Sequence, residues 1–566
     1  MSTSLTSGSA AHGSRVLRSL LPGPGSAVLL VLAVTAATAL PLAAPQFTRR
    51  FVDDAVGGAG IYPLVLIALS YLGLSVAGQA ARMVTAWLGS RVAWDGTNRL
   101  RERLAEHALS LDMAFHGRHT PGEMIERVDG DVVAVADFVV ALLLDVVVSV
   151  LLLCGVIVVV FTIDPGIGMV LLAYCVLIGL GMIRAQRLAV PSATRARAEG
   201  AALLGYLEER LAGADDLRAN GAGEHAVRRL YQVSAALWRT ERRRDAVGSG
   251  ILAGTSVAFA TGTALMLALS GTLSVGTAVL LFQYTLMVRT PFERLLDQLR
   301  QYQTALAGLG RIGDLLAERR TLPVPATVKS LPETGALRLE FDAVDFAYDD
   351  EPVLKGVALS LAPGETLGLV GRTGSGKTTI ARLVARLYDP TAGVVRVGGL
   401  DLREVDAASV RRRIGVVTQD VQLFAASVRD NLTLFRPCAD DERLRAILSE
   451  VGLPDWDLDA QLGKVSAGQA QLLAFARAFL ADPGLVVLDE ASSRLDPATE
   501  GRIEGSMTRL LSGRTGVLIA HRLASLSQVD QIAVVSGGEI VEYGRRRDLL
   551  ADPASRFARM LSGVGR

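Results

Sequence analysis

The segment Gly371–Thr378, with the sequence GRTGSGKT, decides the fold of the region around it. Its spacing, G-x-x-x-x-G-K-T, lets backbone N–H groups point at phosphate oxygens, while the lysine adds positive charge and the threonine hydroxyl can bind Mg²⁺. An apolar stretch, Thr366–Val370, precedes the segment and a helical pattern, Thr379–Tyr388, follows it. A phosphate-binding loop requires this order of strand, loop and helix, and a Gly-rich turn without a ligand does not. The sequence therefore predicts an α/β domain that binds a triphosphate.

A second motif, which ends in two acidic residues, lies downstream of the phosphate loop. Leu485–Glu490, with the sequence LVVLDE, is an apolar strand pattern that ends in two carboxylates. Buried acids without partners would be costly, whereas acids beside Mg²⁺ and a phosphate chain are compensated. We expect Asp489 to hold Mg²⁺ through water and Glu490 to orient or deprotonate the attacking water. The alternative interpretation is a structural pair of acids at a strand end.

The composition of the chain indicates a membrane domain besides the nucleotide-binding domain. With 566 residues, the chain exceeds the size at which one hydrophobic core keeps growing. Its residues are 50% hydrophobic, 5% aromatic and 20% charged, and its mean hydropathy is +0.37. This aliphatic excess is typical of proteins with membrane-spanning helices. The net charge of +1 gives no reason to expect a nucleic acid partner, and three scattered cysteines do not form a disulfide framework.

Stretches without charged residues locate the spanning helices, because an ionised side chain at mid-bilayer costs about 3 kcal/mol. The last such stretch, Ala246–Val288, is long enough for two helices joined by a turn at Ser270–Gly276. We therefore predict a transmembrane domain over residues 1–320 with six spanning helices. These helices are expected at residues 26–48, 58–90, 136–163, 165–190, 246–270 and 274–300.

The loops predict the orientation of these helices. Arginine is dense in Arg82–Arg127 and in Arg184–Arg244, so both loops should face the cytoplasm. Each loop is helix-prone and is broken once, at His116–Gly122 and at Gly213 to Gly223 respectively. We interpret the two loops as helical hairpins that reach toward a cytoplasmic domain. The protein is expected in the cell membrane if it is prokaryotic, with its nucleotide-binding domain in the cytoplasm.

A proline-rich linker separates the two predicted domains. Pro323, Pro325 and Pro332 lie in residues 321–336, and strands alternate with helices after them. We predict a nucleotide-binding domain over residues 337–566. The predicted fold is an all-α six-helix transmembrane domain followed by an α/β P-loop ATPase domain.

Together these motifs resemble an ABC transporter half-subunit of the exporter type, in which a membrane domain is fused to an ATPase domain. The resemblance covers nearly the whole chain, and further motifs follow in the family's order. It implies that Tyr348 stacks on adenine, that Gln419 contacts Mg²⁺ and the membrane domain, and that His521 lies near the γ-phosphate. Asp496 resembles the D-loop aspartate. Alone, Tyr348 would be read as a core aromatic and His521 as an ordinary histidine at a strand end.

The resemblance also assigns sets of residues to ATP and to Mg²⁺. The residues implied for hydrolysis are Glu490, His521 and Lys377, and those for Mg²⁺ are Thr378, Gln419 and Asp489. The residues implied for ATP binding are Tyr348, Gly371, Arg372, Thr373, Gly374, Ser375, Gly376, Lys377, Thr378, Thr379 and Gln419.

The signature segment departs from the family's usual L-S-G-G-Q. Here it reads VSAGQ, comprising Val465, Ser466, Ala467, Gly468 and Gln469, and Ala470 follows in place of an arginine. A Cβ at position 467 crowds a loop that approaches the partner subunit's γ-phosphate. An intact hydrolytic half and a weakened signature half would suit a dimer of two different subunits. We therefore expect a heterodimer with a second ABC half-transporter, with a homodimer as the alternative.

The cargo cannot be read from the motifs. Gln79, Arg82, Asp145 and Arg289 lie in or beside the predicted spans, where polar groups usually face a bundle interior or a water-filled cavity. Structural pairing or snorkelling explains them equally simply. The resemblance implies export of an unknown substrate by alternating access. The alternatives are an importer with an exporter-type fold and a regulatory ATP-binding subunit, and Glu490 and His521 argue against the latter.

Overall fold

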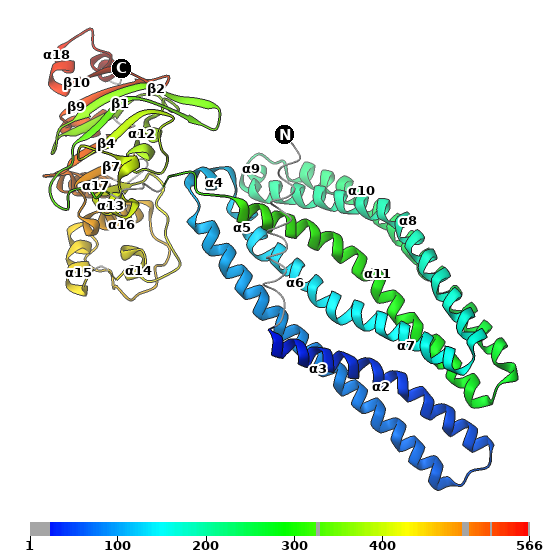
Figure 1. Cartoon of the computed structure of the whole chain (residues 1–566). Helices are drawn as coiled ribbons and strands as arrows, with labels where there is room; N and C mark the ends of the chain where they lie inside the picture. Colours follow the sequence, from blue (N-terminus) through cyan, green and yellow to red (C-terminus); the bar gives the residue numbers. More distant parts are fainter. Residues whose placement is uncertain (1–22, 324–328, 438, 490–496, 521–522, 564–566) are drawn as a thin grey trace. The chain divides into compact units, whose positions relative to one another are not determined.

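The computed structural model describes residues 23–323, 329–437, 439–489, 497–520 and 523–563. The chain divides into two compact units (Figure 1). The first unit comprises residues 1–109 and 121–318, and the second comprises residues 110–120 and 319–566. The short segment 110–120 therefore belongs structurally to the unit that carries the phosphate loop, although it lies far from that loop in the sequence.

The first unit consists of long helices. Its third crossing is a run of helical pieces, namely α5 (Pro121–Ile125), η1 (Glu126–Gly130), α6 (Asp131–Ala141), η2 (Leu142–Val146) and α7 (Val147–Ile163). The other long helices are α2 (Pro24–Val56), α3 (Ile61–Ser110), α8 (Pro165–Ala212), α10 (Gly223–Leu269) and α11 (Val275–Ala317). The short elements are α9 (Ala214–Ala219) between α8 and α10, and η3 (Ser270–Thr272) between α10 and α11.

These helices are longer than the spans predicted from the sequence. The predicted span at 58–90 lies in a helix that ends at Ser110, and the one at 165–190 lies in a helix that ends at Ala212. The difference has a simple cause, because the absence of charge marks only the part in hydrocarbon, whereas backbone hydrogen bonds continue into charged sequence. Within the described residues, five helical runs are long and apolar enough to cross a membrane. Helix α11 is not among the five and carries Gln283 and Arg289.

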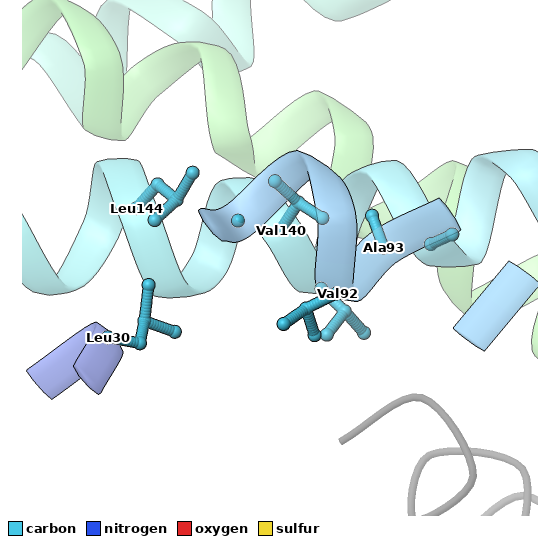
Figure 2. Close-up of a pocket in the computed structure, with 8 residues that line it drawn as sticks. Leu30, Val92, Ala93, Val140 and Leu144 are labelled. Carbon is cyan, nitrogen blue, oxygen red and sulfur yellow. The ribbon is translucent and has the colours of Figure 1, made fainter. Parts of the chain in front are cut away.

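Close helix packing in this unit depends on small residues. A Cβ at Gly89 of α3 would lie 2.4 Å from Cδ1 of Leu144 in η2, so the two elements can approach only because residue 89 is glycine. Figure 2 shows the apolar junction at this point, where Leu30 of α2, Val92 of α3, and Val140 and Leu144 of the third crossing lie close together. The methyl groups of this junction leave almost no free space, as expected for a packed interior.

The second unit contains two sheets. An antiparallel sheet has the strand order β2-β1-β4-β5, and a six-stranded sheet has the order β10-β9-β3-β8-β7-β6. The strands of the first sheet are β1 (Leu339–Tyr348), β2 (Glu351–Leu361), β4 (Ala392–Val397) and β5 (Leu400–Asp401). Those of the second are β3 (Thr366–Val370), β6 (Ile414–Val417), β7 (Leu485–Asp489), β8 (Thr515–Ile519), β9 (Gln531–Ser536) and β10 (Glu539–Arg545).

Helices accompany the strands in alternation, as in other α/β domains. They are α12 (Lys377–Val384), α13 (Ala407–Arg413), α14 (Val428–Thr433), α15 (Asp441–Glu450), α16 (Ala467–Ala481), α17 (Pro497–Leu511), α18 (Arg546–Ala551) and α19 (Arg556–Gly563). Every residue of β3 is buried, because neighbours cover both of its edges and both faces of the sheet are packed. This explains the continuous apolar run before the phosphate loop.

The short helix α4 (Met113–Arg118) packs against the second unit. Asp112, just before α4, accepts a hydrogen bond from the backbone N–H of Leu322 at 2.9 Å. The hydroxyl of Tyr388 donates to the carbonyl oxygen of Met113 at 3.2 Å, and Arg320 donates to the carbonyl oxygen of Ser110 at 2.7 Å. The tip of the first loop is thus held by polar contacts to the linker and to the segment after α12.

Candidate nucleotide-binding site

The topology of the six-stranded sheet gathers the predicted motifs at one edge. Strand β3 pairs in parallel with β8, β8 pairs in parallel with β7, and β7 pairs in parallel with β6. The carboxyl ends of these four strands therefore lie together, and each is followed by one predicted motif. The phosphate loop follows β3, Gln419 lies two residues after β6, and Asp489 ends β7. Ligands of open α/β sheets bind at this edge.

The phosphate loop has a backbone that requires its glycines. Gly374 has a φ of 81° and Gly376 a φ of 109°, both in the left-handed region that residues with a Cβ rarely adopt. A Cβ on Gly376 would also lie 2.6 Å from Cδ2 of Leu354. Gly371 is crowded as well, because a Cβ there would lie 2.2 Å from the carbonyl oxygen of Val535. The loop is therefore held in one shape by its surroundings.

Lys377 and Ser375 fit a bound phosphate chain. The Lys377 side chain is buried at 4% exposure, and its Nζ donates to the carbonyl oxygens of Gly371 at 2.7 Å and Arg372 at 3.0 Å. The ammonium group is thus folded back over the loop. The Ser375 hydroxyl is buried and has no hydrogen-bond partner within the described part of the chain. A phosphate oxygen in the loop would supply the missing acceptor and face the ammonium charge.

Tyr348 lies beside the helix that follows the loop. Its hydroxyl is 3.4 Å from Oγ1 of Thr379 on α12 and accepts a hydrogen bond from Arg382 at 2.9 Å. The Arg382 guanidinium also lies over the ring, 5.8 Å from its centroid. Tyr348 meets Tyr388 edge to face, with 5.2 Å between ring centroids. Burial raises the pKa of Tyr388, so its hydroxyl stays protonated and able to donate.

The signature segment caps the start of helix α16. The Ser466 hydroxyl accepts from the backbone N–H of Gln469 at 3.2 Å, and the Gln469 side chain accepts from the backbone N–H of Ser466 at 2.9 Å. This reciprocal pair is a capping box. Ala467 is the first residue of the helix and is exposed, whereas Gly468 is buried. The departure from the usual sequence therefore leaves the cap intact and places an extra methyl group at the start of the helix.

Two residues that the sequence analysis missed connect α16 to the segment after β6. Gln471 Nε2 is 3.4 Å from the carbonyl oxygen of Thr418. Arg477 donates to the carbonyl oxygens of Asn431 at 2.8 Å and Gln422 at 3.1 Å. Burial lowers the pKa of Arg477. The sequence feature that could have revealed Arg477 is its position as a single arginine within the apolar run LLAFARAF. A charge buried in such a run needs hydrogen-bond partners.

The remaining predicted residues divide between this edge and the undescribed parts of the chain. Thr378 is exposed on the first turn of α12, Gln419 is exposed, Thr379 is buried and Asp489 is half-buried at the end of β7. Arg372 and Thr373 are exposed in the loop. Glu490, Asp496 and His521 lie outside the described residues, so the structure gives no geometry for them.

The sheet edge, its phosphate loop and the separately capped helix define an ATP-binding domain of the ABC type, joined in one chain to long apolar helices. The models of two protein families match the chain in this same order. Residues 27–292 match the ABC transporter transmembrane region, and residues 354–493 match the ABC transporter family.

Known proteins show the same relationship over the whole chain. An uncharacterized ABC transporter ATP-binding protein of Bacillus subtilis is 30% identical over 92% of this chain and 89% of that protein. A multidrug efflux ATP-binding/permease protein of Mycobacterium tuberculosis is 33% identical over 95% of this chain and 46% of that protein. An ATP-dependent lipid A-core flippase of Syntrophus aciditrophicus is 29% identical over 93% of this chain and 89% of that protein. The chain belongs to the ABC transporter family.

A solved structure has the same fold. A bacterial Atm1-family ABC exporter with ATP bound superposes with a TM-score of 0.79 at 24% identity, over 96% of this chain and 98% of that one. With the matches to both families, the chain is an ABC half-transporter of the exporter type whose apolar helices fit a multi-pass integral membrane protein, and ABC exporters of this kind work as dimers. It binds ATP and couples ATPase activity to transport.

Proposed function

We propose that the chain exports an amphipathic substrate from the cytoplasm through the cell membrane, as one half of a heterodimer driven by MgATP. The observation that supports this most is the phosphate loop, with its buried Lys377 folded over a backbone of left-handed glycines. Two similar proteins are named as a multidrug efflux protein and a lipid A-core flippase, and a lipid combines apolar and polar parts. The predicted cytoplasmic side of the nucleotide-binding domain rests on the arginine-rich loops.

We assign each residue at the sheet edge a role in hydrolysis. Lys377 binds the β- and γ-phosphates, backbone N–H groups of Gly371–Gly376 cradle the chain, and Tyr348 stacks on adenine. Thr378, Gln419 and Asp489 supply oxygen ligands, which is the donor set that Mg²⁺ prefers. Magnesium bound there would neutralise phosphate charge. The family resemblance also gives Glu490 the role of orienting or deprotonating water, His521 a role near the γ-phosphate and Asp496 that of the D-loop aspartate, and these three residues lie outside the described part of the chain.

The substitution Glu490→Gln tests the hydrolytic role. It removes the carboxylate charge with almost no change of shape, so we expect most ATP turnover to be lost while ATP binding remains. The matched control is Glu504→Gln on α17, an exposed position, which should leave both quantities unchanged. Unchanged hydrolysis in the Glu490 variant would contradict the assignment.

The heterodimer is inferred from the signature segment. The Ala467 methyl group is exposed at the first residue of α16, where the partner's γ-phosphate would approach a glycine in the usual signature. A partner subunit with an intact signature would complete the ATP site on this chain. The partner's own ATP site would receive the altered segment and turn over more slowly.

Purification of the chain without a partner tests this inference. We expect little ATP hydrolysis by the chain alone, and a several-fold increase after Ala467→Gly. A stable, fully hydrolysing dimer of the unaltered chain would show that the homodimer is correct.

The direction of transport is tested separately in sealed inside-out vesicles, where ATP-driven accumulation supports export and ATP-driven release supports an importer.

A further inference from the structure

The first unit contains a cavity lined by charged and amide side chains. Its volume is about 500 Å³, and helices α3, α6 and α11 and segment η2 contribute its polar lining. A second cavity of about 300 Å³ is mainly apolar and is lined by Pro41, Tyr71 and Met287 among others. Arg82 lines both cavities, so its side chain borders each of them. The charged and amide residues that line the larger cavity are Arg82, Asp137, Asp145, Arg294, Gln298 and Gln301.

Three of these residues occupy a similar depth in the helix bundle. Arg82, Asp145 and Arg294 each lie about 20 residues from the helix end opposite the arginine-rich loops, a distance of about 30 Å at 1.5 Å per residue. The hydrocarbon layer of a bilayer is also about 30 Å thick, so with the orientation that the arginine-rich loops predict we expect these side chains near its cytoplasmic boundary. Asp145 lies in η2, a π-helical turn, and such turns occur frequently at functional sites.

Among the described side chains, the charges in the larger cavity divide into one ion pair and two groups without a partner. Asp145 accepts a hydrogen bond from Arg294 at 3.1 Å and lies 3.5 Å from Nε2 of Gln298. The Gln298 side chain is buried, and its Oε1 finds no partner among the described atoms. In contrast, Arg82 and Asp137 are both exposed and form neither an ion pair nor a hydrogen bond with any described side chain, including each other.

One positive and one negative side chain thus line the same space without neutralising each other. Arg82 lies near the boundary of the hydrocarbon layer, where a charged group usually pairs or marks a substrate path. Asp137 lies about two helical turns beyond Asp145 toward the arginine-rich loops. A ligand that satisfies both must carry one anionic and one cationic group. The adjoining apolar cavity can accept an apolar chain from the same ligand, because Arg82 borders both spaces. The combined space matches the range of about 300–1,000 Å³ that small-molecule sites span.

We propose that these two cavities bind an amphipathic zwitterion. Its anionic group pairs with Arg82, its cationic group pairs with Asp137, and its apolar chain enters the cavity at Pro41 and Tyr71. The amide oxygen of Gln298 accepts a hydrogen bond from the polar part. The proposal rests on the export function proposed above and specifies its substrate class.

The test compares three probes that share a dodecyl chain. They are N-dodecyl-N,N-dimethylglycine, which is zwitterionic, dodecyltrimethylammonium, which is cationic, and dodecanoate, which is anionic. Binding of each radiolabelled probe to the full-length protein is measured in micelles of an uncharged maltoside detergent. We expect the zwitterion to bind at least tenfold more tightly than either singly charged probe.

Variants assign this preference to the two unpaired charges. Arg82→Gln should weaken binding of the zwitterion about tenfold and leave binding of the cation unchanged. Asp137→Asn should weaken binding of the zwitterion to a similar extent and leave binding of the anion unchanged. Arg82→Lys retains the charge and should retain most of the preference. The matched controls are Arg91→Gln and Asp95→Asn on α3, which make the same charge changes outside both cavities and should have no effect.

Two outcomes would overturn the proposal. Equal binding of the three probes would show that Arg82 and Asp137 only extend toward the membrane–water interface and bind no ligand. A preference for the zwitterion that survives both substitutions would place the ligand elsewhere. ATP binding, measured on every variant, reports whether the protein is folded. If ATP failed to drive transport while the zwitterion preference persisted, the proposed function would fail and the ligand site would stand.

Discussion

The contact between Tyr388 and helix α4 gives the prediction that depends most directly on the structure. The Tyr388 hydroxyl donates to the carbonyl oxygen of Met113 at 3.2 Å, while its ring meets the ring of Tyr348 at 5.2 Å. Tyr388→Phe removes the hydrogen bond and keeps the ring contact. A hydrogen bond of this kind contributes about 0.5–1.5 kcal/mol net. Because Tyr388 is only half-buried, water can replace the lost donor, and we expect the substitution to weaken the attachment of α4 by about 0.5–1 kcal/mol.

This free energy corresponds to a two- to fivefold change in the opening equilibrium of α4, since about 1.4 kcal/mol is a factor of ten. The remaining hydrogen bonds, from Leu322 to Asp112 and from Arg320 to Ser110, should keep α4 in place. Amide hydrogen exchange of residues 110–120 in the full-length protein measures the change, and ATP affinity should stay the same because Tyr348 retains its aromatic neighbour. Tyr543→Phe is the matched control, since that hydroxyl donates to the carbonyl oxygen of Ser360 on β2.

The reasoning would be refuted if exchange in residues 110–120 were unchanged in the Tyr388 variant. It would also be refuted if Tyr543→Phe accelerated exchange there equally, because the effect would then not be local. A large loss of ATP affinity would show that Tyr388 acts mainly through the nucleotide site.

Three further predictions concern other contacts. Gly376→Ala should abolish nucleotide binding, because the φ of Gly376 is 109° and a Cβ there would lie 2.6 Å from Cδ2 of Leu354. The control is Gly463→Ala, because a Cβ at Gly463 would lie in open space. Normal nucleotide binding by the Gly376 variant would contradict the loop geometry. Arg477→Leu removes the donors to Gln422 and Asn431, so ATP hydrolysis should fall at least tenfold with a smaller loss of binding, and equal losses of both would indicate a general folding defect. Arg311→Met leaves Asp131, which is 3% exposed in its side chain, without its ion-pair partner. Because the arginine itself is half-exposed, we expect a loss of about 1–3 kcal/mol in stability, visible in thermal unfolding, and an unchanged melting temperature would contradict this.

The phosphate loop and the family could be predicted from the sequence because local spacing carries their physics. Glycines at fixed positions encode the left-handed backbone of the loop, and the apolar runs before Gly371 and Asp489 encode buried parallel strands. The fold class, with a helical transmembrane domain followed by an ATPase domain, is confirmed. The helix ends were not predictable from hydropathy alone, because a helix such as α8 continues into charged sequence.

Contacts between distant parts of the chain could not be read from local patterns. Tyr388 and Met113 are far apart in sequence, and neither residue stands out in its segment. The hydrogen bonds of Arg477 likewise depend on the packing of α16 against α14 and against the segment after β6. Arg82 and Asp145 were noted as polar residues in or beside the spans, but that they line one cavity followed only from the folded helices. The roles of Glu490, Asp496 and His521 stay predictions.

The central claim is that the buried lysine of the phosphate loop binds the triphosphate that drives transport. Equilibrium binding of MgATP to the full-length protein, unaltered and with Lys377→Ala, tests it most directly. The account predicts saturable binding by the unaltered protein and at least tenfold weaker binding by the variant, because the Lys377 ammonium is the buried cation folded over the loop. Equal affinity of the two proteins would contradict it.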